Sequence, residues 1–324
     1  MENLPSTTPI ANEQRPADAS AANWVDKYAP SSAKPYLRLM RADRPVGVWL
    51  LFIPCLWGAS LALATGETTL FTTLKHAALF AVGAFVMRSA GCAYNDIIDK
   101  DIDAKVARTA LRPIPAGQIT LKQAWTSLIL LSFVGFIVLI QFNWVTIAVG
   151  MASLGLVGAY PFMKRITWWP QAWLGLTFNW GALVGFSAAA DRVSLPAMLI
   201  YCAGVSWTLG YDTVYAHQDK EDDALIGVKS SARALGDKTR PALAGFYGVC
   251  VLLFLIIGAL INAHPAYYVS LIPAGMHFIW QVRQFDDADN AGLLKIFKSN
   301  RIAGLLLLLP LLVPLVLDGI AANA

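Results

Sequence analysis

Two runs of acidic residues contain the side chains best suited to chemistry in this sequence. The first run includes Asn95, Asp96, Asp99 and Asp103. In a helix, Asn95, Asp99 and Asp103 would share one face because they recur at intervals of about one turn. Carboxylates stacked in this way repel one another unless water or a cation neutralises them. Oxygen ligands of this kind suit Mg²⁺, which binds one or two carboxylates and completes its octahedron with water and phosphate oxygens.

The second run contains Asp212, Tyr215, Asp219 and Asp223. Their spacing again predicts one face of a continuous helix. A single acidic run at a helix end is usually a solvated loop, but two runs with the same spacing favour a shared ligand. We therefore expect the two runs to hold Mg²⁺ ions around one diphosphate.

Basic residues accompany each run. Lys105, Arg108 and Arg112 follow the first, and Lys220 and Lys229 lie within and after the second. A diphosphate needs this mixture of groups, because metal ions neutralise its inner oxygens while arginine and lysine bind the outer ones. The two runs together therefore predict a site for a metal-bound diphosphate.

Five further cations lie in or beside apolar segments. Arg88 is inside an apolar stretch, where a charge is costly and by default functional. An ion pair that fixes helix packing is an equal alternative for Arg88. The pairs Arg41 with Arg44 and Lys164 with Arg165 flank apolar segments. Taken alone, all four are typical of positive anchors at a membrane surface.

The composition indicates the elements that must position these residues. Of the 324 residues, 56% are hydrophobic and 14% are charged, with a mean hydropathy of +0.53. A soluble domain would have about 25% charged residues, so much of the surface does not face water. The apolar residues form blocks long enough to cross a bilayer as helices. Runs such as Gly304–Leu317 do not alternate between apolar and polar residues, which argues against a membrane barrel.

These blocks predict an all-α, polytopic membrane bundle of about nine transmembrane helices. The expected spans are 46–64, 76–95, 121–140, 144–160, 170–189, 195–211, 242–262, 267–281 and 302–320. Nearly all of the 25 lysines and arginines then lie on the side of the N-terminus. The other side has Lys75 and Arg192, and Arg88 falls inside a span. The positive-inside rule therefore places the N-terminus and both acidic runs in the cytoplasm.

The first residues differ in composition from the rest. Residues 1–35 are polar, lack the apolar core of a signal peptide, and carry acidic residues that a mitochondrial transit peptide would lack. We expect a mobile polar tail over 1–35 and a membrane domain over 36–324. Within the tail, Trp24 to Leu39 is expected to form an amphipathic helix on the membrane surface.

The acidic motifs resemble those of the UbiA superfamily of intramembrane prenyltransferases, over roughly residues 36 to 320. The NDxxDxxxD motif of that superfamily matches Asn95, Asp96, Asp99 and Asp103, and its DxxxD motif matches Asp219 and Asp223. The segments Met87–Cys92, Tyr160–Arg165 and Gly227–Ser231 are similar to those of the 4-hydroxybenzoate polyprenyltransferase branch.

The resemblance implies a helical bundle around a central cavity with a cytoplasmic polar cap. It implies transfer of a polyprenyl group from polyprenyl diphosphate to the ring of 4-hydroxybenzoate, ortho to the phenol, with release of diphosphate, in ubiquinone biosynthesis. The implied ligands of Mg²⁺ are Asn95, Asp96, Asp99, Asp103, Asp219 and Asp223. The expected substrate-binding residues are Arg44, Arg88, Asn95, Lys105, Arg108, Arg112, Lys164 and Tyr215. The expected catalytic residues are Asp99, Asp219, Asp212 and Arg165.

The chemistry assigns different tasks to these groups. The basic residues and Mg²⁺ stabilise the leaving diphosphate, and Arg44 is expected to hold the benzoate carboxylate. Asp212 or another motif carboxylate would orient the phenol or take the ring proton. Trp49, Phe178 and Trp207 are candidates for aromatic walls that stabilise an allylic cation.

Two alternatives use the same residues differently. The acceptor could be homogentisate or a naphthoate. In another class, an ion-coupled transporter could have Arg88 in its bundle and acidic residues at one mouth. We expect the lipid bilayer as the environment and no nucleic acid, and no partner protein is identifiable. The resemblance and the tail composition together predict a bacterial cell inner membrane.

Overall fold

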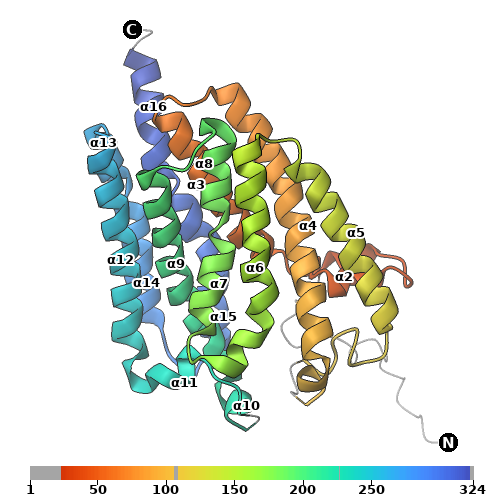
Figure 1. The fold of residues 1–324 in the computed structure, drawn as a ribbon. Coiled ribbons are helices and arrows are strands. Elements are labelled where there is room, and N and C mark those ends of the chain that lie inside the picture. Colours follow the sequence, from red (N-terminus) through yellow and green to blue (C-terminus); the bar gives the residue numbers. More distant parts are fainter. Residues whose placement is uncertain (1–22, 106–108, 226, 322–324) are drawn as a thin grey trace, which may run out of the picture. The chain divides into compact units, whose positions relative to one another are not determined.

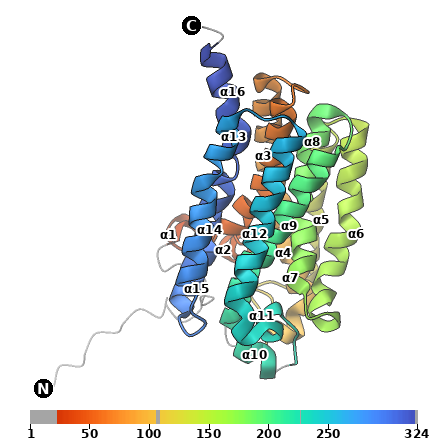
Figure 2. The same cartoon turned by 90° about the vertical axis from the view of Figure 1, so that its left-hand side faces the viewer.

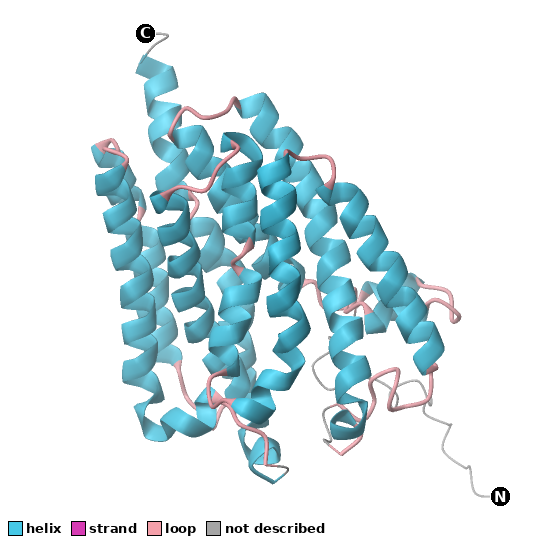
Figure 3. Cartoon of the chain, viewed as in Figure 1, coloured by secondary structure: helices cyan, strands magenta, loops and turns pink. Residues whose placement is uncertain are grey.

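The computed structural model describes residues 23–105, 109–225 and 227–321. All regular elements in these ranges are helices (Figure 3), which confirms the expected all-α class. The chain divides into two compact units. One contains Met1–Pro45 with Ser89–Ser132, and the other contains Val46–Arg88 with Phe133–Ala324. The acidic motif at Asn95 belongs to the first unit and the motif at Asp219 to the second.

The first unit forms around the last part of one long helix. Its elements are α1 (Trp24–Tyr28), α2 (Lys34–Leu39), the end of α4 (Leu70–Asp103) and the beginning of α5 (Leu121–Leu139). A small apolar cluster joins them and contains Leu39, Ala93, Ile97, Ile119 and Ala124.

The expected single helix from Trp24 to Leu39 is wrong, because the structure has two short helices there. Pro30 lies between them. A proline disfavours the helical conformation of the residue before it. Ala29, which precedes Pro30, is accordingly extended, with φ −75° and ψ 142°. Asn23 caps α1, since its side chain accepts a hydrogen bond from the Asp26 backbone N–H.

The second unit holds most of the helices, seen from two directions in Figures 1 and 2. Its elements are α3 (Val46–Ala64), the first part of α4, the end of α5, α6 (Trp144–Ile166), α7 (Pro170–Phe178), α8 (Gly181–Ala190), α9 (Leu195–Ala216), η2 (His217–Asp219), α10 (Lys220–Leu225), α11 (Ser231–Leu235), η3 (Gly236–Lys238), α12 (Thr239–Leu260), α13 (Pro265–Ser270), α14 (Ile272–Gln284), α15 (Asn290–Leu306) and α16 (Leu309–Ala321). Helix α9 packs against α7, α8, α12 and α15.

Six helical segments of the described residues are long and apolar enough to cross a membrane. They are Val46–Ala64, Leu70–Asp103, Leu121–Leu139, Trp144–Ile166, Ser231–Leu260 and Asn290–Leu317. Length and composition therefore do not establish the expected nine spans. The expected span 170–189 divides into α7 and α8 at Asn179, and 267–281 divides into α13 and α14. Neither half of a divided span reaches the roughly 20 residues that a bilayer needs.

Glycines allow α3 and α8 to pack backbone against backbone. A Cβ atom on Gly58 would lie 2.0 Å from the Ala182 carbonyl oxygen, and one on Gly185 would lie 2.1 Å from the Cys55 carbonyl oxygen. Only a residue without a side chain fits at either position. Small residues are the usual means of close helix contact within membranes.

A buried polar network connects α9, α12, α14 and α15. The Trp207 indole N–H donates to Asn300 Oδ1 at 2.9 Å, and the Asn300 and Gln281 amides donate to each other at 3.1 Å. The Tyr247 hydroxyl donates to Gln281 Oε1 at 2.6 Å. All four residues are almost fully buried. Lipid offers no alternative partners, so these bonds fix how the four helices pack.

Substituting alanine at Gly58 or Gly185 is expected to destabilise the protein by about 1–3 kcal/mol, because the added methyl group must displace backbone. Thermal melting of the detergent-solubilised chain measures this change. Gly155→Ala is the matched control, since a Cβ there meets no atom within 4 Å. Melting of all three variants at the same temperature would show that α3 and α8 do not pack this closely.

Candidate functional site

The first acidic motif lies on α4, which runs without interruption to Asp103. This confirms the expected helical continuation, so Asn95, Asp99 and Asp103 share one helix face. Asp96 and Asp99 are fully buried and Asp103 is nearly so. Burial of carboxylates at this density requires positive charge close by, because an isolated buried charge is strongly unfavourable.

Two arginines supply positive charge at Asp96. Arg41 Nη2 lies 2.7 Å and Arg112 Nη1 lies 3.2 Å from Asp96 Oδ1. The same Arg112 nitrogen lies 2.6 Å from Asp103 Oδ2. Arg112 was predicted to bind the diphosphate, and in the structure its guanidinium contacts two carboxylates of the motif.

Arg41 is the residue that the sequence analysis missed. It was interpreted only as a membrane anchor, yet its guanidinium binds Asp96. Burial acts to lower the pKa of Arg41, but the negative groups around it, above all the Asp96 carboxylate, together outweigh burial and raise the pKa above its usual value. Arg41 adopts the left-handed conformation, with φ +58°, which is unfavourable for residues other than glycine. No spacing or periodicity in the sequence signals this contact.

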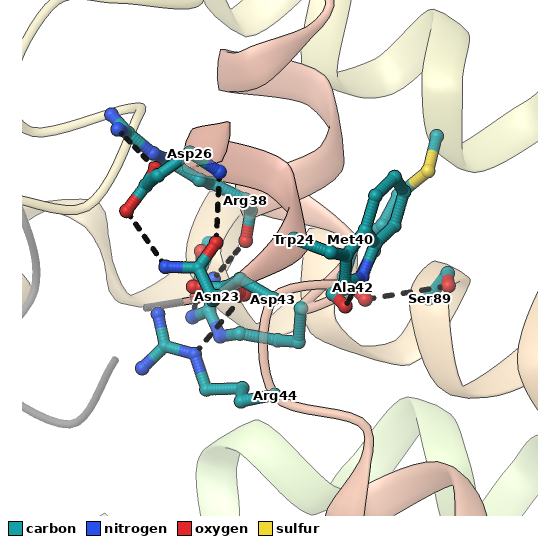
Figure 4. A network of polar contacts seen from close by, with 11 residues as sticks. Asn23, Trp24, Asp26, Arg38, Met40, Ala42, Asp43, Arg44 and Ser89 are labelled. Carbon is teal, nitrogen blue, oxygen red and sulfur yellow. Dashed lines mark hydrogen bonds and ion pairs between the residues drawn. The ribbon is translucent and has the colours of Figure 1, made fainter. Parts of the chain in front are cut away.

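Side chains from α1 and α4 hold the loop that carries Arg41 (Figure 4). The Trp24 indole N–H donates to the Ala42 carbonyl oxygen at 2.8 Å. The Ser89 hydroxyl on α4 donates to the Met40 carbonyl oxygen at 3.4 Å. The carbonyls on both sides of Arg41 are therefore bound, which limits how far the strained residue can relax.

Arg44 lies beside Asp43 in the same loop, with 3.3 Å between Nε and Oδ1. Arg44 was predicted to hold a benzoate carboxylate, and here its partner is a carboxylate of the protein. Burial raises the pKa of Asp43 to about 6, although Arg41 opposes the shift. A second ion pair, Arg38 with Asp26 at 2.9 Å, joins α2 to α1.

The second motif is not the continuous helix that its spacing predicted. Helix α9 ends at Ala216, a 3₁₀ turn occupies His217–Asp219, and α10 begins at Lys220. A 3₁₀ helix has 3.0 residues per turn instead of 3.6, so Asp219 and Asp223 are rotated about the helix axis relative to the positions that a continuous α-helix would give them. The three carboxylates still lie in one unit, and the charge of Asp219 acts on Asp212.

Arg88 lies near Asp212 in the second unit and interacts electrostatically with it. Its guanidinium carbon is 5.4 Å from the centre of the Phe178 ring, a cation–π contact. Gly47 provides the space, because a Cβ there would lie 2.4 Å from Arg88 Nε. Phe178 was a candidate for stabilising an allylic cation, and in the structure it faces the Arg88 cation.

The remaining predicted residues have diverse surroundings. The Tyr215 ring packs on Phe297 at 4.4 Å between centroids. Lys164 is partly buried, and its carbonyl oxygen accepts from the Lys229 backbone N–H. Arg165 is exposed and lies 5.9 Å from the Phe162 ring centre.

The other expected positions differ in how far they are exposed. Lys105 is exposed just beyond the end of α4, and Arg108 lies outside the described residues. Trp207 is fully buried in the packed core, and Trp49 lies beneath Arg301 at 5.8 Å.

The donor atoms fit Mg²⁺. Every motif side chain offers oxygen, and Asp96 Oδ2 is buried without a hydrogen-bond partner among the described residues. Within the described ranges, no group of three or more acidic, histidine or cysteine side chains could hold a metal by itself. Mg²⁺ does not need such a group, since it usually keeps waters and phosphate oxygens beside one or two carboxylates.

Removing Arg41 is expected to destabilise the protein, because Asp96 would lose one of the two arginines that bind it. The expected cost of Arg41→Ala is about 1–3 kcal/mol, below the figure for a wholly unpaired buried charge because Arg112 remains. Thermal melting of Arg41→Ala, with and without Asp96→Asn, measures this cost. The double variant should recover most of the loss. Arg192→Ala, which breaks the exposed pair with Glu67, is the control and should change little; equal effects of the two arginine variants would refute the role of Arg41.

Asp43 is expected to make stability depend on pH. Its pKa of about 6 in the folded protein is above the ordinary value of about 3.9. Its contribution to stability is therefore fully present below about pH 4 and is lost as pH rises through about 6. Relative to the unmodified chain, Asp43→Asn should gain melting temperature as pH increases from 5 to 8. A constant difference across that range would contradict the prediction.

Comparison with known proteins points to the same family as the two acidic motifs. The family model described as the UbiA prenyltransferase family matches residues 51–308. A relative from Dictyostelium discoideum, named 4-hydroxybenzoate polyprenyltransferase, mitochondrial, is 44% identical over 92% of this chain. The chain spans 64% of the length of that relative. A relative of the same name from Rattus norvegicus is 45% identical over 91% of this chain and 78% of its own length.

These relatives correct one expectation. They are mitochondrial enzymes of eukaryotes, which overturns the expected bacterial inner membrane. A multi-pass membrane protein remains consistent with the helices.

Solved structures share the fold. A UbiA homolog from Aeropyrum pernix K1 has a TM-score of 0.65 at 23% identity and covers 83% of this chain and 97% of its own. A homolog from Archaeoglobus fulgidus bound to GPP and Mg²⁺ has a TM-score of 0.60 at 18% identity, over 86% and 98% of the two chains. The family match includes both acidic motifs and most of the chain, and the protein belongs to the UbiA prenyltransferase family.

Proposed function

We propose that this protein transfers a polyprenyl group from polyprenyl diphosphate to the ring of 4-hydroxybenzoate, ortho to the phenol, and releases diphosphate, in ubiquinone biosynthesis. The observation that carries the proposal is the identity of 44–45% to curated 4-hydroxybenzoate polyprenyltransferases over most of the chain. Membership of a prenyltransferase family argues against the transporter alternative.

Mg²⁺ is the proposed metal, and the motif residues are its proposed ligands: Asn95, Asp96, Asp99, Asp103, Asp219 and Asp223. The Archaeoglobus fulgidus homolog, which was solved bound to GPP and Mg²⁺, supports this choice. When bound, the metal neutralises charge on the leaving diphosphate. Asp96 would offer its Oδ2 atom, because Oδ1 already accepts from two arginines.

The basic residues are proposed to stabilise the same leaving group. Lys105, Arg108 and Arg112 follow the first motif, and Lys164 and Arg165 end α6. Since Arg112 contacts Asp96 and Asp103, it is proposed to hold these carboxylates while its remaining donors reach the phosphate oxygens.

Four residues are proposed to act on the acceptor: Arg44, Arg88, Asp212 and Tyr215. As the carbon–oxygen bond to diphosphate breaks, the ring carbon ortho to the phenol forms a bond to the prenyl carbon and then loses its proton. Asp212 is the proposed proton acceptor or phenol-orienting group. The guanidinium of Arg88 interacts electrostatically with the Asp212 carboxylate. Tyr215 lies three residues after Asp212 on α9. Arg44 remains the proposed partner of the benzoate carboxylate, in exchange for Asp43.

The finer architecture is also proposed. Counting α7 with α8 and α13 with α14 as single crossings, together with α9, would complete nine spans around a central cavity with a polar cap. We propose the membrane domain over 36–324, preceded by a mobile tail over 1–35. Residues 1–22 of that tail lie outside the described residues.

The test is an assay of the purified chain in nanodiscs with radiolabelled 4-hydroxybenzoate, a polyprenyl diphosphate and Mg²⁺. We expect a lipid-soluble product that disappears with EDTA. Asp99→Asn and Asp219→Asn should each lower the rate by about 10²-fold or more, because each removes a proposed carboxylate ligand of the Mg²⁺ that neutralises the leaving group.

Matched controls come from the same two segments. Asp101→Asn and Glu221→Gln alter exposed acidic residues beside each motif and should keep most of the activity. Release of diphosphate without this product would show that the acceptor is wrong. A folded chain that yields neither product nor diphosphate with several donors would refute the proposed reaction.

A further inference from the structure

The loop Phe285–Asp289, between α14 and α15, lies against the second acidic motif. Phe285 is almost fully buried, and its ring meets the His217 ring edge to face, with 5.1 Å between centroids. Arg240 at the start of α12 donates to the Phe285 carbonyl oxygen at 2.5 Å. Lys220 Nζ lies 3.3 Å from Asp287 Oδ2. The loop is thus attached both to α12 and to the residue that follows Asp219.

His217 is the centre of these contacts. It is 5% exposed, and its Nε2 lies 3.1 Å from Thr239 Oγ1. The Thr239 hydroxyl donates its hydrogen to the Gly236 carbonyl oxygen at 2.7 Å. With that hydrogen assigned to Gly236, Nε2 is assigned as the donor in its hydrogen bond with Thr239. Thr239 is the first residue of α12, so the bond joins the second motif to another helix.

The hydrogen bond between His217 and Thr239 matters because of where His217 lies in the chain. His217 begins the 3₁₀ turn that ends at Asp219. The sequence spacing predicted an α-helix through this segment, and 3₁₀ geometry is intrinsically the poorer of the two. Contacts from outside the segment can therefore decide whether the turn keeps its 3₁₀ form. If it reverted to α-helix, Asp219 and Asp223 would rotate about the helix axis relative to Asp212.

We propose that His217 is a positioning residue that holds this turn in its 3₁₀ form, through Thr239 and Phe285, and so sets the directions of Asp219 and Asp223. An apolar ring at this position could pack on Phe285 but could not bind Thr239. The consequence for metal–diphosphate binding rests on the proposed function, whereas the effect on the turn does not.

The first measurement is hydrogen exchange of the backbone amides of residues 217–225 in the full chain, without metal or substrate. His217→Phe keeps the ring packing and removes the bond, and Thr239→Val removes its partner. Both should exchange faster than the unmodified chain by about tenfold, because the turn opens more often. His217→Gln keeps a donor at similar reach and should stay within about threefold. Thr126→Val, an exposed threonine on α5, is the control.

The second measurement is the Mg²⁺ concentration that gives half-maximal equilibrium binding of a radiolabelled polyprenyl diphosphate. His217→Phe and Thr239→Val should raise it by about tenfold, as expected for residues that orient ligands, and His217→Gln should restore it. In the Asp219→Asn background, His217→Phe should add little, because its effect acts through Asp219.

The outcomes separate the two proposals. If the unmodified chain binds no polyprenyl diphosphate, the proposed function fails and the exchange data still decide the role of His217. If His217→Phe only lowers the melting temperature, with unchanged exchange and unchanged Mg²⁺ dependence well below melting, the positioning role is refuted. The positioning role is also refuted by a second result, in which both the exchange rate and the Mg²⁺ dependence of His217→Gln match those of His217→Phe while those of Thr239→Val match the unmodified chain.

Discussion

Polar groups buried inside this protein must find their partners within the protein, because burial removes them from water and the lipid around the spans offers no replacement. Asp96 shows the constraint most directly, since it is fully buried and accepts from two guanidinium groups. To reach it, Arg41 adopts a left-handed backbone conformation, and the carbonyls on both sides of Arg41 are bound by Trp24 and Ser89. The unfavourable conformation is tolerated because the alternative is a poorly neutralised buried carboxylate.

The same constraint organises the second unit. The hydrogen bonds among Trp207, Asn300, Gln281 and Tyr247 join four helices, and Trp207 lies little more than one turn before Asp212. Close packing of α3 and α8 through Gly58 and Gly185 adds a contact that no larger residue permits. Helix α9 therefore has a defined position, on which its polar C-terminal end depends. A rigid scaffold is what a site needs when its chemistry relies on preorganised charge.

Burying clustered carboxylates and arginines costs desolvation free energy, so a contribution to folding stability alone does not account for them. Well-packed apolar residues often serve equally well in place of a buried ion pair. The proposed diphosphate substrate gives a reason to keep these groups, since the negative charge that develops on it must be met by cations and metal ions. The contacts of Arg112 and Arg44 with Asp103 and Asp43 then describe how these cations are held by the protein itself.

Local composition and spacing were enough to predict the helical class, the apolar segments, the two acidic runs and the uninterrupted helix through Asp103. They were not enough to predict that α9 gives way to a 3₁₀ turn at His217, or that Arg41 binds Asp96. The division of the expected span 170–189 at Asn179 likewise became visible only in the folded chain. Helical spacing assigns residues to one face only while the helix continues, and whether it continues depends on contacts with distant residues such as Thr239 and Phe285. The partner of a charged side chain in the same way depends on which segments the fold brings together.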